Sequence, residues 1–222
     1  MPRGTYSLYD PADRTPLGTE RFHCAPGPHG WRYVSRLTGP TGEEHGSLDL
    51  TLDALARPLR LELRTRAWQI RGGVLDGVTW VRSAATDAQD APARDRGRGL
   101  HDAQEGNATA HGFTGASPAF LIACAYLARP APGDPGTRLR LVAFTPPALA
   151  PRTVDRSWAL TGTETHHTDT GPLTVDAYRV TDLETAEQHT VHLAGDVVLS
   201  APGVELEDLD TPPSAFPTPP AH

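Results

Sequence analysis

Hydrophobic and charged residues alternate in two stretches of the first third of the chain. Leu59–Arg66 reads Leu-Arg-Leu-Glu-Leu-Arg-Thr-Arg, and Leu48–Asp53 reads Leu-Asp-Leu-Thr-Leu-Asp. Because successive side chains of a β-strand point to opposite faces, this period of two predicts strands with one buried face and one solvated face. That combination is typical of antiparallel sheets.

Shorter stretches of the same kind recur along the chain. They predict further strands at Thr5–Tyr9, Gly18–Cys24, Trp31–Leu37, Val74–Arg82, Arg138–Thr145, Thr153–Thr163, Leu173–Thr181 and His189–Leu199. Turn-forming pairs such as Asp10-Pro11 and Gly39-Pro40 separate them. About ten short strands at this spacing predict a mainly β fold, in which a strongly curved antiparallel sheet forms a half-barrel or open barrel.

One segment departs from the alternating pattern and predicts a helix. Pro118–Ala128 is apolar almost throughout, and Pro130 follows it closely. Ser117 can accept a hydrogen bond from the first free amides, and Pro118 suits the first helical position. A helix that is apolar on every side is a buried helix. We therefore expect the sheet to wrap around this one helix.

The length and the local composition indicate one folded domain over residues 1–203. A chain of 222 residues suits one large domain. Residues 84–111 are rich in Asp, Arg, Ala and Gly, which predicts a mobile insertion that is either disordered or a lid. Residues 204–222 begin acidic and end rich in proline, which predicts a disordered tail.

The charge balance and the absence of targeting signals narrow the function classes. The chain has 20 basic and 27 acidic residues, a net charge of −7, so we expect no nucleic-acid partner. All the basic residues are arginine, which we attribute to a GC-rich bacterial genome. The sequence shows neither a signal peptide nor an apolar run long enough to span a membrane. We therefore expect a cytoplasmic protein in which Cys24 and Cys124 are buried, reduced thiols.

Motifs for cofactor, metal or nucleophilic chemistry are missing from the sequence. There is no phosphate-binding loop and no nucleophile elbow, so we expect no cofactor and assign no catalytic residue. His166, His167 and Asp169 are close in sequence, but neighbouring strand residues point to opposite faces. Because a zinc site needs three or four converging ligands, we predict no metal site and expect these side chains to be solvated.

The candidate ligand-binding residues are polar or aromatic side chains expected on the concave face. Arg156 shares the parity of Val154 and Trp158, so it should face the apolar side. An arginine there needs an internal carboxylate, a ligand anion or a path for its head to water. His189 shares the parity of Val191, which makes it either a core histidine or a polar anchor or acid/base in a cavity wall.

Two aromatic residues complete this candidate set. Trp68 has the parity of Arg64 and Arg66, on the solvated face, where it could stack on a ligand or be covered by a neighbouring loop. Tyr126 lies on the predicted helix. The predicted ligand-binding residues are therefore Trp68, Trp158, Arg156, His189 and Tyr126.

The order of these parts resembles a known family. An opening hairpin over Tyr6–Phe22 is followed by Trp31-Arg-Tyr, the alternating Leu59–Arg66 stretch and the apolar Pro118–Ala128 helix. A final block joins Trp158-Ala-Leu-Thr-Gly-Thr-Glu to Leu173-Thr-Val-Asp-Ala-Tyr-Arg-Val. This arrangement is similar to that of the glycolipid-binding proteins and the related lipoprotein-carrier-like half-barrels. The resemblance implies a sheet that curls around a helix and an apolar cavity. It does not identify any catalytic residue in this chain.

Three function hypotheses follow from the expected architecture. The first is a cytoplasmic protein that binds an apolar or amphipathic small molecule, lipid- or glycolipid-like, in the concavity that one helix fills only in part. The second is an enzyme in the same cavity, a cyclase, isomerase or hydrolase, with His189 as acid/base and Arg156 as anion anchor. The third is a structural or interaction module.

Overall fold

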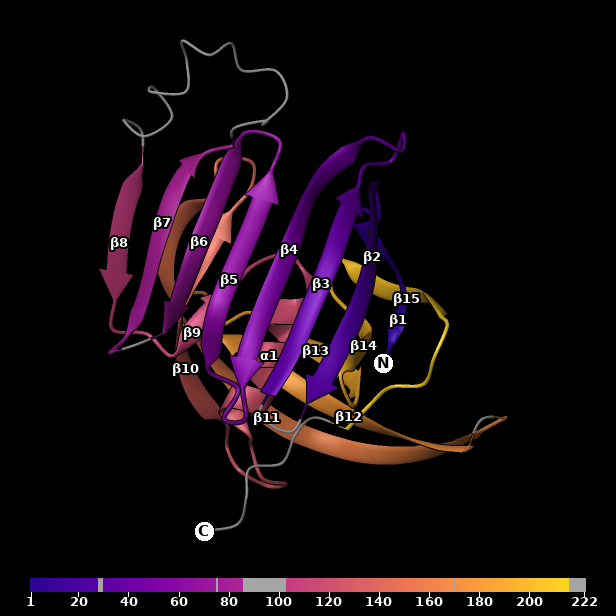
Figure 1. The fold of residues 1–222 in the computed structure, drawn as a ribbon. Helices are drawn as coiled ribbons and strands as arrows, with labels where there is room; N and C mark the ends of the chain where they lie inside the picture. Colours follow the sequence, from indigo (N-terminus) through magenta and orange to yellow (C-terminus); the bar gives the residue numbers. More distant parts are fainter. Residues whose placement is uncertain (28–29, 75, 86–102, 170, 216–222) are drawn as a thin grey trace.

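The computed structural model describes residues 1–27, 30–74, 76–85, 103–169 and 171–215 (Figure 1). Its strands are β1 (Arg3–Tyr9), β2 (Pro16–Gly27), β3 (Gly30–Thr38), β4 (Glu44–Asp53), β5 (Pro58–Thr65), β6 (Trp68–Val74), β7 (Val78–Ala84), β8 (Gln104–Ala108), β9 (Gly112–Thr114), β10 (Thr137–Thr145), β11 (Ala150–Thr168), β12 (Gly171–Asp182), β13 (Gln188–Ala194), β14 (Val197–Ala201) and β15 (Val204–Leu209). One helix, α1 (Pro118–Ala128), lies between β9 and β10 in the described chain. The prediction of a mainly β fold with one helix is confirmed, and the sheet has fifteen strands where we expected about ten.

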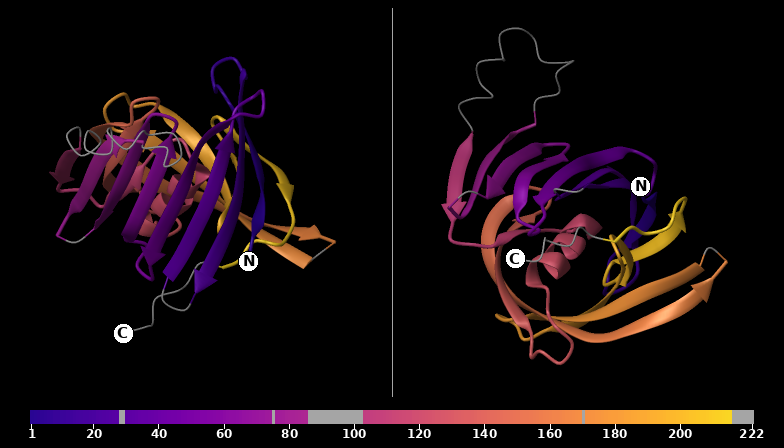
Figure 2. Two further views of the ribbon diagram at one scale, coloured as in Figure 1. Left: turned by 45° about the horizontal axis from the view of Figure 1, so that its top comes forward. Right: turned by 60° about the horizontal axis from the view of Figure 1, so that its bottom comes forward.

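The strand order shows that the sheet is rolled. The order is β8-β7-β6-β5-β4-β3-β2-β1-β15-β14-β13-β12-β11-β10-β9, so the chain starts in the middle, runs out to one edge and returns from the other. Residues 109–111 alone connect β8 at one edge to β9 at the opposite edge. Because each residue spans at most about 3.6 Å, this short link brings the two edges close together. Figure 2 shows the resulting roll, with α1 inside it.

The two ends of the sheet overlap and make contact through side chains. The cross-strand register places Trp80, Gly72 and Leu61 on one face, the inner face that also carries Leu50. The Trp80 ring lies 6.2 Å from the ring of Phe144, which belongs to the outer face of β10. The inner face of β6 and β7 therefore packs on the outside of β10, and the roll turns past the point of closure.

Gly72 is required by this overlap. A Cβ atom at this position would lie 2.7 Å from the Thr79 carbonyl oxygen and 2.8 Å from Cζ of Phe113. We expect Gly72→Ala to lower the free energy of unfolding by about 1–3 kcal/mol, the usual effect of overpacking. Gly162→Ala is the matched control, since a Cβ there meets nothing within 4 Å. Urea denaturation followed by circular dichroism measures both, and equal stabilities would contradict the overlap.

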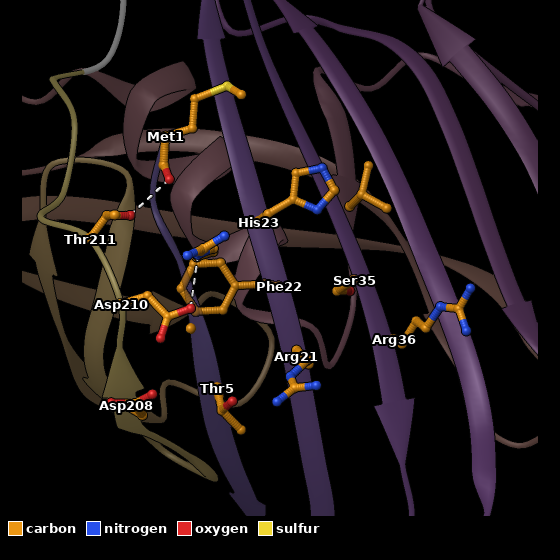
Figure 3. A pocket seen from close by; sticks show the side chains of 13 residues that line it. Met1, Thr5, Arg21, Phe22, His23, Ser35, Arg36, Asp208, Asp210 and Thr211 are labelled. Atoms are coloured by element: carbon orange, nitrogen blue, oxygen red, sulfur yellow. Dashed lines mark hydrogen bonds and ion pairs between the residues drawn. The ribbon is translucent and has the colours of Figure 1, made fainter.

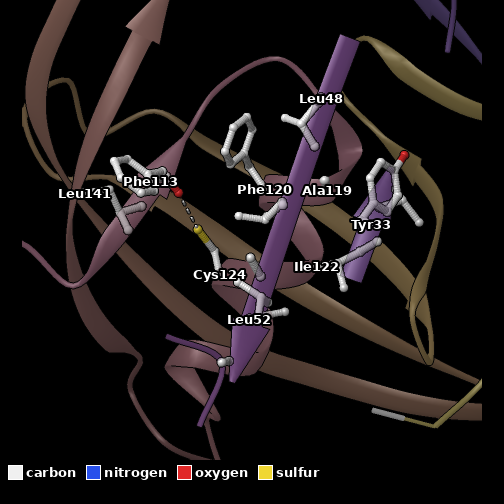
Figure 4. Packing of buried hydrophobic residues seen from close by; sticks show 14 of the residues in the cluster. Tyr33, Leu48, Leu52, Phe113, Ala119, Phe120, Ile122, Cys124 and Leu141 are labelled. Atoms are coloured by element: carbon white, nitrogen blue, oxygen red, sulfur yellow. Dashed lines mark hydrogen bonds between the residues drawn. The ribbon is translucent and has the colours of Figure 1, made fainter. Parts of the chain in front are cut away.

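Helix α1 begins and ends at the residues that the sequence indicates. The Ser117 side chain accepts a hydrogen bond from the Ala119 amide, and Pro118 occupies the first turn. The chain leaves the helix at Arg129, in the left-handed region with φ of 41°. Eight of the eleven residues are buried, as expected for a helix with no polar face. Figure 4 shows Phe120, Ile122 and Cys124 among side chains of the surrounding strands.

Several predicted strand boundaries are wrong. Val74–Arg82 covers the end of β6 and part of β7, with residue 75 outside the described residues, and His189–Leu199 is β13, a turn and β14. In both cases a tight hairpin joins two apolar strands, so the pattern reads as one run. Strands β8 and β9 were not predicted, because both are short and neither alternates clearly.

The folded domain extends past the predicted boundary at residue 203. Strand β15 pairs with β1 and β14 in the middle of the sheet, so Val204–Leu209 belongs to the domain and not to a tail. The predicted insertion at residues 84–111 includes β8, and residues 86–102 lie outside the described residues. Residues 216–222 of the predicted tail also lie outside them.

Both cysteines are free and buried, which confirms the prediction of reduced thiols. Burial raises the pKa of Cys24 well above its usual range and that of Cys124 to about 12. Neither thiol is therefore ionised near neutral pH.

The described part of the chain has no helix with the length and apolar character that crossing a bilayer requires.

Candidate functional site

Three of the predicted ligand-binding residues lie on the inner wall of the roll. Arg156 and Trp158 are two residues apart on β11, and both face inward. Nη1 of Arg156 donates a hydrogen bond to Thr114 Oγ1 at 3.2 Å. Nε of Arg156 and Nε1 of Trp158 are buried and have no hydrogen-bond partner in the structure. These two orphaned donors are a polar feature of an otherwise apolar wall.

His189 lies close enough to Arg156 to be affected by its charge. It pairs with Val180 in the β12–β13 register and is half-buried. Burial lowers the pKa of His189, and the positive charge of Arg156 lowers it further. The imidazole of His189 is therefore uncharged near neutral pH. The parity argument for Arg156 and His189 is thus confirmed.

The other two predicted residues lie elsewhere. Trp68 is the first residue of β6 and does not belong to β5. The turn at residues 66–67 separates the two strands, so the even-numbered residues, which face outward on β5, face inward on β6. It faces the core, and the guanidinium of Arg82 stacks 3.4 Å from its ring centre, so its predicted place on the solvated face is wrong. Tyr126 is half-buried on α1 and packs against the core. None of the five predicted residues lines any of the hollows described below.

The hollow beside α1 is much smaller than a ligand. It lies between the helix and the ends of β4 and β9, and its walls include Leu52, Phe113, Phe120 and Cys124. Its volume is about 10 Å³, which is room for one water molecule at most. The expected ligand-sized space is therefore not found at this place, because Phe120 and its neighbours occupy it (Figure 4).

A buried carboxyl group lies at the N-terminus of α1, and the sequence analysis did not single it out. Glu20 on β2 is fully buried, and its Oε1 accepts hydrogen bonds from Ser117 Oγ at 2.6 Å and Tyr33 Oη at 3.0 Å. Glu20 Oε2 and the Ser35 hydroxyl are both buried, and neither makes a hydrogen bond of ordinary geometry. Burial raises the pKa of Glu20, and the nearby hydroxyl groups of Ser117, Ser35 and Tyr33 oppose this only in part. Parity could have revealed it, since Glu20 alternates with the apolar Phe22.

The largest hollow described lies on the outer face of the sheet, over β1, β2 and β3 and beside β15. Its volume is about 900 Å³. Figure 3 shows Met1 and His23 toward its upper end, and Arg21 and Arg36 toward its lower end. We call this space the outer hollow.

Arg21 and Arg36 form an unneutralised pair in the outer hollow. They are directly opposite each other in the β2–β3 register, and both are exposed. Neither makes an ion pair with a described residue, although neighbouring arginines do. Arg32, for example, lies 2.6 Å from Asp49. Asp208 on β15 also lines the outer hollow, and Asp210 is paired with Arg3, so the positive charge is local to the β2–β3 side of the hollow.

A smaller hollow of about 440 Å³ lies beside the β11–β12 hairpin. Its walls are mostly apolar, with Leu173, Val175 and Leu199 among them. The Ser200 hydroxyl lies 3.0 Å from Nδ1 of His192. Such a pair is one part of a nucleophilic site, but no described residue orients the other nitrogen of this imidazole.

The described residues contain no group of three or more His, Cys, Asp and Glu side chains placed to hold a metal ion. His166 makes an exposed contact with Glu164 at 3.4 Å.

Comparisons of the chain with protein-family models, with curated proteins and with solved structures find no match.

Proposed function

We propose that this chain binds an amphipathic small molecule that carries an acidic group, and that this group binds between Arg21 and Arg36 in the outer hollow. The cross-strand arginine pair without a carboxylate partner supports this proposal above all other observations. Like charges directly opposite each other on neighbouring strands repel. In Figure 3 the two guanidinium groups point away from each other, so an anion between them would bind once these exposed side chains turn toward it, and it would then accept charge-assisted hydrogen bonds from both.

The size and lining of the outer hollow suit such a ligand. A volume of about 900 Å³ lies within the range of small-molecule sites. Met1 and Val34 offer apolar contacts away from the arginine pair, and the arginine stems add more. A fatty acid or an acidic glycolipid belongs to this class. The proposal keeps the ligand class expected from the sequence and places it on the outer face, since the hollow beside α1 holds about 10 Å³.

The alternative of a cavity enzyme lacks a comparable site. His189 and Arg156 face the inside of the roll, and neither lines a described hollow with room for a substrate. Arg156 is already bonded to Thr114. The proposed function is therefore binding, with no chemical step.

Calorimetric titration with octanoate and its neutral analogue octanamide tests this proposal. We expect octanoate to bind and octanamide to bind more weakly, because only octanoate carries the charge that the arginines attract. The double variant Arg21→Gln/Arg36→Gln should weaken octanoate binding about tenfold, or about 1.4 kcal/mol. The variant should be at least as stable as the native chain, because it removes a repulsive pair.

Arg32→Gln is the matched control. Arg32 lies on the same strand and face as Arg36 but is paired with Asp49. It should leave octanoate binding unchanged. The proposal is wrong if octanoate does not bind, if octanamide binds equally well, or if Arg32→Gln weakens octanoate binding as much as the double variant does.

A further inference from the structure

The arginine pair belongs to a longer row across the outer face. The register places Arg21 opposite Arg36, Arg36 opposite Ser47, and Ser47 opposite Arg64, on strands β2 to β5. Residues directly opposite each other share a face of the sheet, so these side chains form one line perpendicular to the strands. In the other direction the line continues through Thr5 to Asp208. The row is therefore cationic over β2–β5 and turns acidic at β15.

The third arginine of the row also lacks an acidic partner among the described residues. Arg64 contacts the neutral side-chain oxygen of Gln69, at 3.1 Å from Nη2. In the adjacent row of the same face, by contrast, Glu62 lies 2.9 Å from Arg60 and 3.5 Å from Arg71. The row that contains Arg21, Arg36 and Arg64 thus differs from the adjacent row, in which Glu62 neutralises its arginine neighbours.

A second hollow follows directly after the outer hollow along this row. It has a volume of about 490 Å³, and Ser47, Arg64 and Arg66 line it, with Glu44 and His45 also in its wall. Arg36 and Arg64 are two strands apart, which corresponds to about 10 Å at the usual strand spacing. Ser47 between them is small and uncharged, so it places no opposing charge between the two sites.

From this spacing we infer that the ligand is a dianion, with one acidic group at Arg21 and Arg36 and a second, about 10 Å away, at Arg64. The inference rests on the proposed function, because it uses the same primary anchor. Its chemical class is an extended molecule with an acidic group at each end. Asp208, at the other end of the row, would repel the second acidic group. The molecule should therefore extend across β4 and β5 and away from β15.

The test compares octanoate with suberate, the diacid of the same chain length, by calorimetric titration. Suberate should bind about fivefold more tightly than octanoate, as one additional exposed ion pair allows. Glutarate, a shorter diacid, should show no such gain, because it cannot span the two sites. Arg64→Gln should bring suberate to the affinity of octanoate and leave octanoate unchanged.

Arg71→Gln is the control, since Arg71 lies on the neighbouring strand and is paired with Glu62. It should change neither affinity. Equal affinities of suberate and octanoate for the native chain, or an equal loss of both in Arg64→Gln, would overturn the dianion inference. Octanoate binding that still depends on Arg21 and Arg36 would then leave the proposed function standing. If neither acid binds, both are wrong.

Discussion

Replacing Phe120 by alanine should lower the free energy of unfolding by about 3–5 kcal/mol. Phe120 lies on α1 inside the roll and is 1% exposed, among the largest side chains buried to this degree. It borders the hollow of about 10 Å³ beside Leu52 and Cys124. Because these neighbours belong to rigid strands and to the helix itself, they can collapse only in part, and a cavity should remain. Urea denaturation monitored by tryptophan fluorescence measures the effect.

Leu121→Ala on the next position of α1 is the control for this substitution. Leu121 is only half-buried, so its loss should be less than half that of Phe120→Ala. The enlarged apolar cavity of Phe120→Ala should also bind benzene, as dry engineered cavities do, whereas the native chain should not. A loss below about 1 kcal/mol, or benzene binding by the native chain, would show that the inside of the roll is not filled as described.

The helix could be predicted from sequence because its signals are local. Ser117, Pro118 and Pro130 mark its ends, and the apolar composition between them requires burial. The inward direction of Arg156 and His189 likewise follows from parity within one strand. The same rule identifies Glu20, which alternates with apolar residues on β2.

The overlap of the two ends of the sheet could not be predicted, because it depends on contacts between distant segments. The link between β8 and β9 joins opposite edges of the sheet, and the contact of Trp80 with Phe144 forms only once the ends overlap. The expectation of spare space around α1 assumed an open half-barrel. In the roll, side chains from many strands surround the helix instead.

The candidate site was missed for a similar reason. Arg21 and Arg36 are ordinary solvent-facing strand residues when each strand is considered alone. They become neighbours only through the β2–β3 register, and a shift of one residue would place one of them on the opposite face. Trp68 shows the converse error, because a turn that the pattern did not reveal separates it from β5 and reverses its parity.

The carboxyl group of Glu20 makes the stability of the fold depend on pH in a direction that one substitution can test. Burial raises its pKa above the usual 4.5. As the pH rises above 4.5, the unfolded chain loses this proton while the folded chain retains it. The free energy of unfolding therefore falls by about 1.4 kcal/mol for each pH unit until the folded pKa is reached, and this contribution then stays constant.

Glu20→Gln should remove this decline, because glutamine has the same shape and does not ionise. Its side-chain oxygen can still accept the hydrogen bonds from Ser117 and Tyr33 that Oε1 accepts now. Its amide group takes the place of Oε2, which is buried without a hydrogen bond of ordinary geometry, and it can donate a hydrogen bond toward the Ser35 hydroxyl. The variant should thus match the native chain near pH 4 and exceed its stability at pH 7.

Urea denaturation from pH 4 to pH 8 measures the free energy of unfolding of the native chain and of Glu20→Gln. In the difference between these two values, the contributions of all other titrating groups cancel. Glu105→Gln on β8 is the control, since Glu105 is exposed and the substitution should leave the pH dependence unchanged. The ¹³C chemical shift of the Glu20 carboxyl provides an independent titration. If Glu20→Gln is less stable than the native chain at pH 7, the N-terminal end of α1 favours the carboxylate more than burial disfavours it, and the assigned direction is wrong.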